Sequence, residues 1–100
     1  MLININSEEE FKRLDKKHLA VLFVGSFCPM CRMMKPMFCE LCDEHKIDYI
    51  VLTYDNFKTI CHKYAVEGVP HFILFKTNDD FESYQGYYSE EELEKILKEF

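Results

Sequence analysis

The sequence predicts an α/β fold in which a central mixed β-sheet is flanked by helices on both faces. Short apolar runs rich in β-branched residues alternate along the chain with segments of helical period, and this alternation is typical of a sheet covered by helices. The last two expected strands are joined by the short, turn-rich stretch "TNDD". A tight connection makes that pair antiparallel, so the sheet is mixed.

In the N-terminal half, "LINI" is expected to be a first strand. "SEEEF" then opens a helix, because Ser7 and Glu10 have the spacing of a capping box. The continuous apolar run Leu19–Val24 predicts a strand buried on both faces.

A longer helix is expected from Met30 to about His45. Pro36 lies inside it and cannot donate a hydrogen bond to the carbonyl of Arg32, so we expect a kink. The apolar residues that define the helical stripe are Met34, Met37, Phe38, Leu41 and Cys42.

In the C-terminal half, "DYIVLTYD" predicts a buried strand and "NFKTICHKY" a helix. "GVP" interrupts the chain, and "HFILFK" and "FESYQGYY" predict the last two strands. "SEEELEKILKEF" predicts a final amphipathic helix, in which Ser89 and Glu92 have the spacing of a capping box.

The composition limits the class of protein. With 100 residues, 48% of them hydrophobic, we expect one domain that spans residues 1–100. Asp and Glu number 18 against 12 Lys and Arg, and a formal charge of −6 disfavours nucleic acid and anionic membranes as partners. No apolar run approaches the roughly 18 residues of a membrane span, and "MLININSEEEF" does not resemble a signal peptide. We therefore expect a cytoplasmic protein, whose thiols are kept reduced.

The stretch "FCPMC" carries the most specific chemistry. Cys28 follows a strand and Cys31 opens a helix, where unpaired N–H groups and the helix dipole stabilise a thiolate. Such a position lowers a cysteine pKa from about 8.5 to between about 3.5 and 7.5. Cys28 can then attack a substrate disulfide, and Cys31 can resolve the mixed disulfide that results. Pro29 suits the first turn because it has no N–H to leave unpaired.

From about Leu19 to Phe100 the chain resembles the thioredoxin family. The matching features are "FCPMC" after an apolar strand, Pro36 five residues past Cys31, "YAVEGVPHFILF", and Gly86 near the last strand. The resemblance implies a thioredoxin-like fold and a protein-disulfide oxidoreductase that works through a reversible Cys28–Cys31 dithiol.

The resemblance also implies how substrates are held. The Val69–Pro70 bond is cis in this family, lies against the CxxC sulfurs, and pairs with the substrate chain. We expect the substrate-binding residues to be Phe27, Pro29, Met30, Val69 and Pro70. The expected partners are proteins with disulfides and a donor such as a thioredoxin reductase, and no bound cofactor or metal is expected.

The chain departs from the family pattern at six positions. "FCPMC" replaces the usual "WCGPC", and Pro29 in the first inner position is more like glutaredoxins. Leu22 and Val51 align with a buried Asp and its Lys neighbour, so neither charge is present, and His71 follows the expected cis-proline in place of the frequent Thr. His71 is the candidate substitute for the missing proton acceptor.

Two alternative functions remain open. A glutathione-dependent glutaredoxin is suggested by Pro29, although no Gly-Gly pair follows the last strands. A non-enzymatic soft-metal or thiol-binding module is suggested by the methionines around the motif, of which Met34 and Met37 are expected to pack inside and Met30 to be exposed.

A zinc site made of "CPMC" and "CELC" is disfavoured, because in one helix the two pairs lie about 16 Å apart and zinc ligands lie about 2.3 Å from the metal. We interpret Cys39 and Cys42 as surface or packing cysteines rather than a second redox pair. Cys61 lies on an apolar helical face and is expected in the core.

Overall fold

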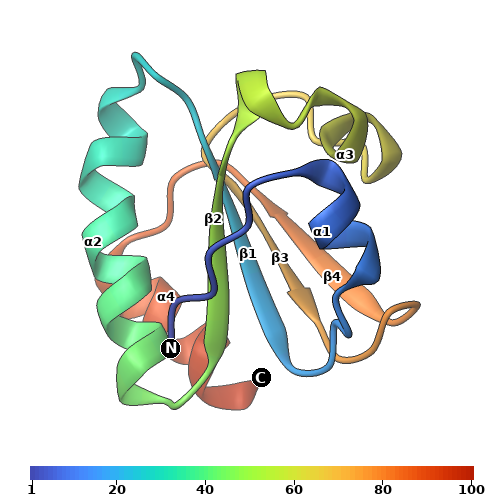
Figure 1. The fold of residues 1–100 in the computed structure, drawn as a ribbon. Helices are drawn as coiled ribbons and strands as arrows, with labels where there is room; N and C mark the ends of the chain where they lie inside the picture. Colours follow the sequence, from blue (N-terminus) through green and yellow to red (C-terminus); the bar gives the residue numbers. More distant parts are fainter.

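A four-stranded β-sheet forms the centre of the computed structural model, which describes all 100 residues (Figure 1). The strands are β1 (Leu19–Val24), β2 (Asp48–Thr53), β3 (His71–Phe75) and β4 (Phe81–Gln85). Their order across the sheet is β2-β1-β3-β4. β1 and β2 are parallel, whereas β1–β3 and β3–β4 are antiparallel, so the sheet is mixed, as the sequence predicts.

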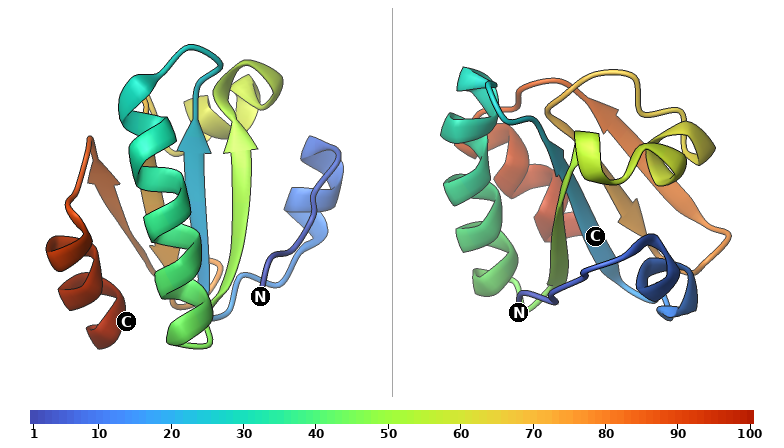
Figure 2. Two further views of the ribbon diagram at one scale, coloured as in Figure 1. Left: turned by 90° about the vertical axis from the view of Figure 1, so that its left-hand side faces the viewer. Right: turned by 45° about the horizontal axis from the view of Figure 1, so that its top comes forward.

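Helices cover both faces of this sheet. They are α1 (Glu8–Arg13), α2 (Pro29–Glu44), the 3-10 helix η1 (Tyr54–Asn56), α3 (Lys58–Lys63) and α4 (Glu90–Glu99). Figure 2 shows α2 and α4 in front of the strands in one view, whereas α1 and α3 lie behind them or to the side. The structure contains no helix with the length and apolar character that crossing a membrane requires.

β1 connects the two halves of the core. Leu19, Val21 and Phe23 pack on the side of α1 and α3, whereas Ala20 and Leu22 pack on the side of α2 and α4. Successive side chains of a strand point to opposite faces, and all five are 2% exposed or less. The prediction of a strand buried on both faces is therefore confirmed.

The capping patterns are formed to different extents. In α4 the expected capping box is complete, since the Glu92 N–H donates to Ser89 Oγ and the Ser89 N–H donates to the Glu92 carboxylate. In α1 only half of it forms. The Glu10 N–H donates to Ser7 Oγ, but the Glu10 carboxylate accepts a hydrogen bond from the Asn6 N–H.

The N-terminal segment differs from the prediction, because "LINI" does not form a strand of the sheet. It makes one parallel bridge, between Leu2 and Tyr49 of β2. Two backbone hydrogen bonds hold it, from the Ile3 N–H to the Tyr49 carbonyl and from the Tyr49 N–H to the Met1 carbonyl. The chain must then turn from β2 toward α1, which begins only five residues after Ile3, and this short path ends the pairing.

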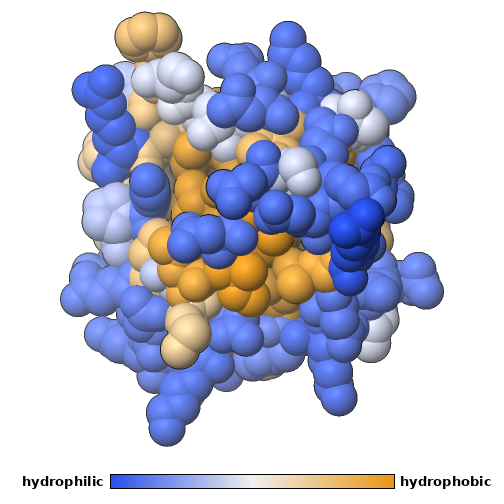
Figure 3. Space-filling view, viewed as in Figure 1, coloured by the Kyte–Doolittle hydropathy of each residue, from blue (hydrophilic) through white to orange (hydrophobic).

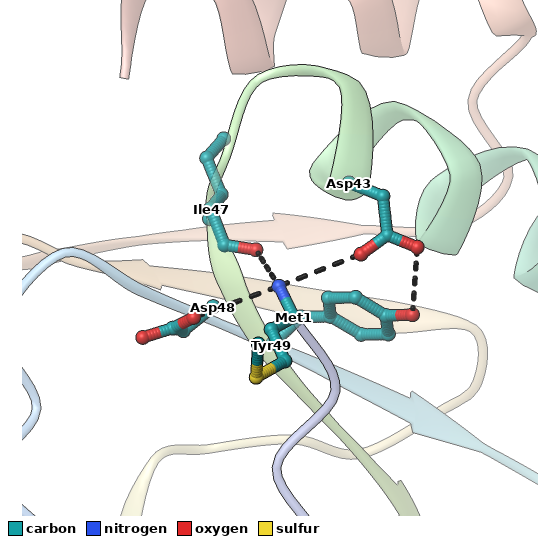
Figure 4. Close-up of polar contacts among 5 residues, drawn as sticks. All are labelled: Met1, Asp43, Ile47, Asp48 and Tyr49. Carbon is teal, nitrogen blue, oxygen red and sulfur yellow. Dashed lines mark hydrogen bonds and ion pairs between the residues drawn. The ribbon is translucent and has the colours of Figure 1, made fainter.

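Polar contacts tie Met1 to the bottom of the sheet. Its ammonium donates to the carbonyl of Ile47 at 3.0 Å and lies 3.4 Å from Asp43 Oδ1 and 3.5 Å from Asp48 Oδ1. The Tyr49 hydroxyl donates to the other Asp43 oxygen (Figure 4). These contacts join the start of the chain to the end of α2 and the start of β2, so the bridge is anchored at one end.

Candidate active site

The two cysteines of "FCPMC" lie at the N-terminus of α2, at the upper end of that helix in Figure 1. Cys28 is the N-cap residue, and its Sγ accepts a hydrogen bond from the Cys31 N–H at 3.2 Å. Pro29 occupies the first helical position, as the sequence predicts. Cys28 and Cys31 form a disulfide bond, with their Cα atoms 5.2 Å apart. A backbone donor is thus aimed at the sulfur that would bear negative charge after reduction.

The two sulfurs differ in access. Cys28 is half-buried and can be reached from solvent, whereas Cys31 is 3% exposed and belongs to the buried side of α2. A substrate disulfide can therefore approach only Cys28. This asymmetry is what a nucleophile and a resolving thiol require.

The loop before β3 closes the other side of the site. The Val69–Pro70 peptide bond is cis, and the Val69 carbonyl oxygen lies 3.8 Å from Cys28 Sγ. The Gly86 N–H donates to the Pro70 carbonyl at 2.9 Å. Segments more than 40 residues apart in sequence thus meet at the sulfur.

Gly25 makes this approach possible, and the sequence analysis did not identify it. A Cβ on Gly25 would lie 2.9 Å from Val69 Cγ2 and 3.5 Å from Cys28 Cβ. A larger residue here would therefore force the Val69 side chain to shift, so glycine lets Val69 pack this close to the motif. The signal was available, because a glycine between a strand and a reactive motif often marks a close backbone approach.

Three large apolar side chains that adjoin the disulfide in sequence are exposed to solvent. Phe27 is 94% exposed, Met30 45% and Met33 53%. Met34 is fully buried and Met37 is partly buried, so the expected division of the methionines between core and surface is confirmed. Exposed apolar groups in one place mark a surface that contacts other molecules.

No carboxylate replaces the missing buried Asp. Leu22 is fully buried among the side chains that face α2, and its neighbour across the β1–β2 pair is Val51. The backbone of His71 is paired with Phe23, whose side chain belongs to the opposite face of the sheet. The His71 ring packs against the Phe23 ring, with 6.2 Å between the ring centroids, and so lies on the face of the sheet opposite Leu22. It therefore does not occupy the place of the missing acid.

The other three cysteines are free. Burial raises the pKa of Cys42 to about 12 and that of Cys61 to about 11, and it also raises the pKa of Cys39. Cys42 and Cys61 are buried, as predicted for packing residues, whereas Cys39 is half-buried. No group of three or more His, Cys, Asp or Glu side chains is placed to hold a metal ion.

Cys39 faces a hollow in the surface beside the N-terminal segment. Apolar side chains gather in the middle of the face shown in Figure 3. The residues that line the hollow include Leu2, Ile5, Val24, Val51 and Cys39. The hollow holds no second thiol, since Cys42 points into the core.

Comparison with known proteins points to one family. A sequence model described as Thioredoxin matches residues 2–99. Thioredoxin-1 of Caenorhabditis elegans is 28% identical over 91% of this chain and 84% of its own length. An H-type thioredoxin of Ricinus communis is 30% identical over 92% of this chain and 80% of its own length. Glutaredoxin-3 of Bos taurus is 29% identical over 90% of this chain but only 28% of its own length.

Solved structures agree on the fold. A mutant thioredoxin from Halobacterium salinarum superposes with a TM-score of 0.84 at 19% identity, covering 98% of this chain and 88% of the other. A thioredoxin from Nicotiana alata gives a TM-score of 0.83 at 23% identity, covering 98% of this chain and 90% of the other. At these identities the similarity is evidence for the fold, and the CxxC geometry carries the chemistry.

Proposed function

Because this chain belongs to the thioredoxin family and is a thiol-disulfide oxidoreductase that acts through the Cys28–Cys31 pair, we propose specific roles for its site residues. Cys28 is the nucleophile and Cys31 is the resolving thiol. The observation that carries this assignment is the difference in access, since Cys28 is half-buried and Cys31 is 3% exposed.

The reaction proceeds in two exchanges. The Cys28 thiolate attacks one sulfur of a substrate disulfide, forms a mixed disulfide, and releases the other substrate sulfur as a thiolate that takes up a proton. Cys31 then loses its proton and attacks Cys28 Sγ. The second substrate sulfur leaves as a thiol, and the Cys28–Cys31 disulfide is formed. Two electrons have passed from the dithiol to the substrate, and no bound cofactor takes part.

The substrate lies against the exposed face around Cys28. Phe27 and Met30 offer apolar contact at 94% and 45% exposure, and Pro29 stiffens the turn between the sulfurs. The backbone of Val69, whose carbonyl is 3.8 Å from Cys28 Sγ, pairs with the substrate chain beside its cysteine, and Pro70 holds that backbone in place. Substrates are therefore proteins with an accessible disulfide in an extended segment.

The wider setting follows from the same proposal. The donor that reduces the Cys28–Cys31 disulfide is a thioredoxin reductase, and the chain works as one domain, residues 1–100. We place the protein in a reducing compartment such as the cytoplasm, where a dithiol that reduces substrates is kept reduced. The formal charge of −6 gives no basis for nucleic acid or an anionic membrane as a partner.

Trapping of substrates tests the two roles. In a Cys31→Ser variant attack survives and resolution does not, so mixed disulfides with substrate proteins should accumulate through Cys28 and disappear on treatment with dithiothreitol. Cys39→Ser is the matched control and should trap nothing. If Cys31→Ser traps no more than the control, or if the bond forms through another cysteine, the assignment is wrong.

A glutaredoxin-like activity is the second candidate. Pro29 in the first inner position and the 29% identity with a segment of bovine glutaredoxin-3 favour it. Reduced glutathione alone would then turn the enzyme over. Turnover that requires a flavin reductase instead excludes this alternative.

A further inference from the structure

The end of β4 holds the cis-proline loop, residues 68–71, through two hydrogen bonds, and the Gln85 side chain also lies near Gly68. The Gln85 amide oxygen lies 2.8 Å from His71 Nδ1, and the Gln85 amide nitrogen lies 3.2 Å from the position that a Cβ on Gly68 would take. The next residue, Gly86, donates its N–H to the Pro70 carbonyl. The Gln85 side chain therefore hydrogen-bonds the end of the segment Gly68–His71 and lies near its start, and the backbone N–H of Gly86 holds the middle.

The hydrogen bond with Gln85 is the only one that the His71 side chain makes. With the Gln85 amide in this orientation its oxygen accepts, which requires the hydrogen of the neutral His71 ring to be on Nδ1. The other ring nitrogen, Nε2, is buried without a hydrogen-bond partner, and the residue is 4% exposed. A buried polar group that lacks a partner costs free energy, which a plain apolar residue at this position would avoid. The chain therefore keeps an imidazole where only one of its nitrogens is satisfied.

The segment that this contact holds is the one that meets the reactive sulfur. Val69 lies within this segment, and its carbonyl oxygen is 3.8 Å from Cys28 Sγ. The Val69 side chain packs close to Gly25, since a Cβ added there would lie 2.9 Å from Val69 Cγ2. The hydrogen bonds that Pro70 and His71 make with the end of β4 hold the backbone next to Val69.

We propose that His71 and Gln85 are positioning residues that set the Val69 backbone for pairing with the peptide chain of a protein substrate. The inference rests on the proposed function, in which Val69 pairs with the substrate beside its disulfide. His71 takes no part in proton transfer, since it lies on the face of the sheet opposite Leu22. Its effect is on the binding of substrates that present a backbone.

This role separates two kinds of substrate. A disulfide-bonded protein such as insulin presents a peptide chain to Val69, whereas the small aromatic disulfide 5,5′-dithiobis(2-nitrobenzoate) presents none. Loss of the His71–Gln85 hydrogen bond should raise KM for insulin by about three- to tenfold, the range of one neutral hydrogen bond. The kcat for insulin, and both constants for the small disulfide, should stay within about twofold, because the sulfurs do not move.

Three variants and a control carry out this test. Gln85→Leu removes the acceptor at an exposed position that should not disturb folding, and His71→Leu removes the donor. His71→Asn retains an N–H near the place of Nδ1 and should restore much of the wild-type KM. Ser83→Ala, at an exposed position on the same strand, is the matched control and should change nothing.

A spectroscopic measurement reads the contact directly. In the ¹⁵N spectrum of the wild-type imidazole, Nδ1 of His71 should carry the hydrogen, and Gln85→Leu should shift the hydrogen toward Nε2. The inference is overturned if Nδ1 is unprotonated in the neutral wild-type ring, if Gln85→Leu leaves KM for insulin unchanged, or if it slows both substrates alike. If the wild type reduces neither substrate, the proposed function itself fails, and the inference with it.

Discussion

Two pairs of cysteines have the same spacing on the same helix, Cys28 with Cys31 and Cys39 with Cys42. The first pair forms a disulfide and its outer sulfur can be reached from solvent. The second pair is free, and burial raises the pKa of Cys42 to about 12. Residues three apart on a helix are always neighbours, so the spacing alone does not distinguish the pairs.

The end of the helix accounts for the difference. At the N-terminus of α2 the Cys31 N–H has no carbonyl one turn earlier and points at Cys28 Sγ. In the middle of α2 the N–H groups are used by carbonyls four residues before them, so none is available to Cys39. The cis-proline loop also faces only the first pair. A CxxC motif therefore becomes reactive through its place on the helix.

The largest expected difference between the two pairs is the loss of activity when the first cysteine of each pair is replaced. Cys28→Ser should lower the rate of disulfide reduction by roughly a thousandfold or more, because a serine hydroxyl is not ionised at neutral pH. Cys39→Ser, the corresponding outer cysteine of the second pair, should retain activity within about twofold. Insulin reduction measured for both variants checks this. Comparable losses in the two variants would show that the second pair takes part in catalysis.

Alkylation of the reduced protein should follow the environment of each thiol. Only thiolates react, and a pKa of about 12 leaves about one Cys42 in ten thousand ionised at pH 8. Cys28 should react first with iodoacetamide, whereas Cys61 should react roughly a thousandfold and Cys42 roughly ten-thousandfold more slowly. Peptide mass spectrometry over time gives the order. In 8 M urea, where burial is lost, the differences should largely vanish, and an early modification of Cys42 in the folded protein would contradict the comparison.

A carboxylate placed under the first pair should change its chemistry. Leu22→Asp supplies a proton acceptor on the α2 side of β1, and it should speed resolution of the mixed disulfide at pH 7 by about tenfold or more. The same change buries an unpaired charge and should cost about 3 kcal/mol or more of unfolding free energy.

Leu22→Asn is the control for this experiment, since it buries a polar group of equal size that cannot accept a proton. It should destabilise the protein without speeding resolution. Stopped-flow kinetics and urea unfolding measure the two effects. If Leu22→Asp leaves stability unchanged, Leu22 does not lie buried beneath the motif. If both variants speed resolution alike, the added carboxylate does not act as a proton acceptor.

The second pair should affect stability at high pH. The folded-state pKa of Cys42, about 12, lies above its value of about 8.5 in the unfolded chain, so the folded state binds the proton more tightly. The contribution of this proton to the free energy of unfolding is complete below pH 8.5 and is lost as pH rises to about 12. Between these values the free energy of unfolding falls by up to about 1.4 kcal/mol per pH unit for one group.

Cys42→Ala should therefore unfold with a shallower pH dependence between pH 9 and 12 than the wild type. Both are compared in the oxidised state, where Cys28 and Cys31 do not titrate. Tyr49 and Tyr84, whose pKa values are raised to about 12 by burial, contribute equally to both proteins. Parallel curves from urea unfolding would show that Cys42 is not the group that titrates.

Several features of the site could be predicted from the sequence because they depend on local patterns. The run Leu19–Val24 predicts β1, "FCPMC" after it predicts a reactive helix N-terminus, and the pattern of methionines predicts which lie inside. The N-terminal segment was predicted less well. "LINI" has the composition of a strand, but its pairing with β2 depends on the path to α1, which leaves room for a single bridge.

The sequence by itself therefore determined the order of helices and strands from Glu8 onward, the mixed sheet and the position of the reactive pair, since apolar periodicity, caps and turn residues act over a few residues. Only the tertiary structure decided which sulfur is accessible, that Gly25 lets Val69 approach Cys28, and that His71 pairs with Gln85 on the face away from Leu22. These contacts join segments that are 14 to 44 residues apart in the chain. They depend on strand register and on the packing of loops across the sheet, which no local pattern encodes.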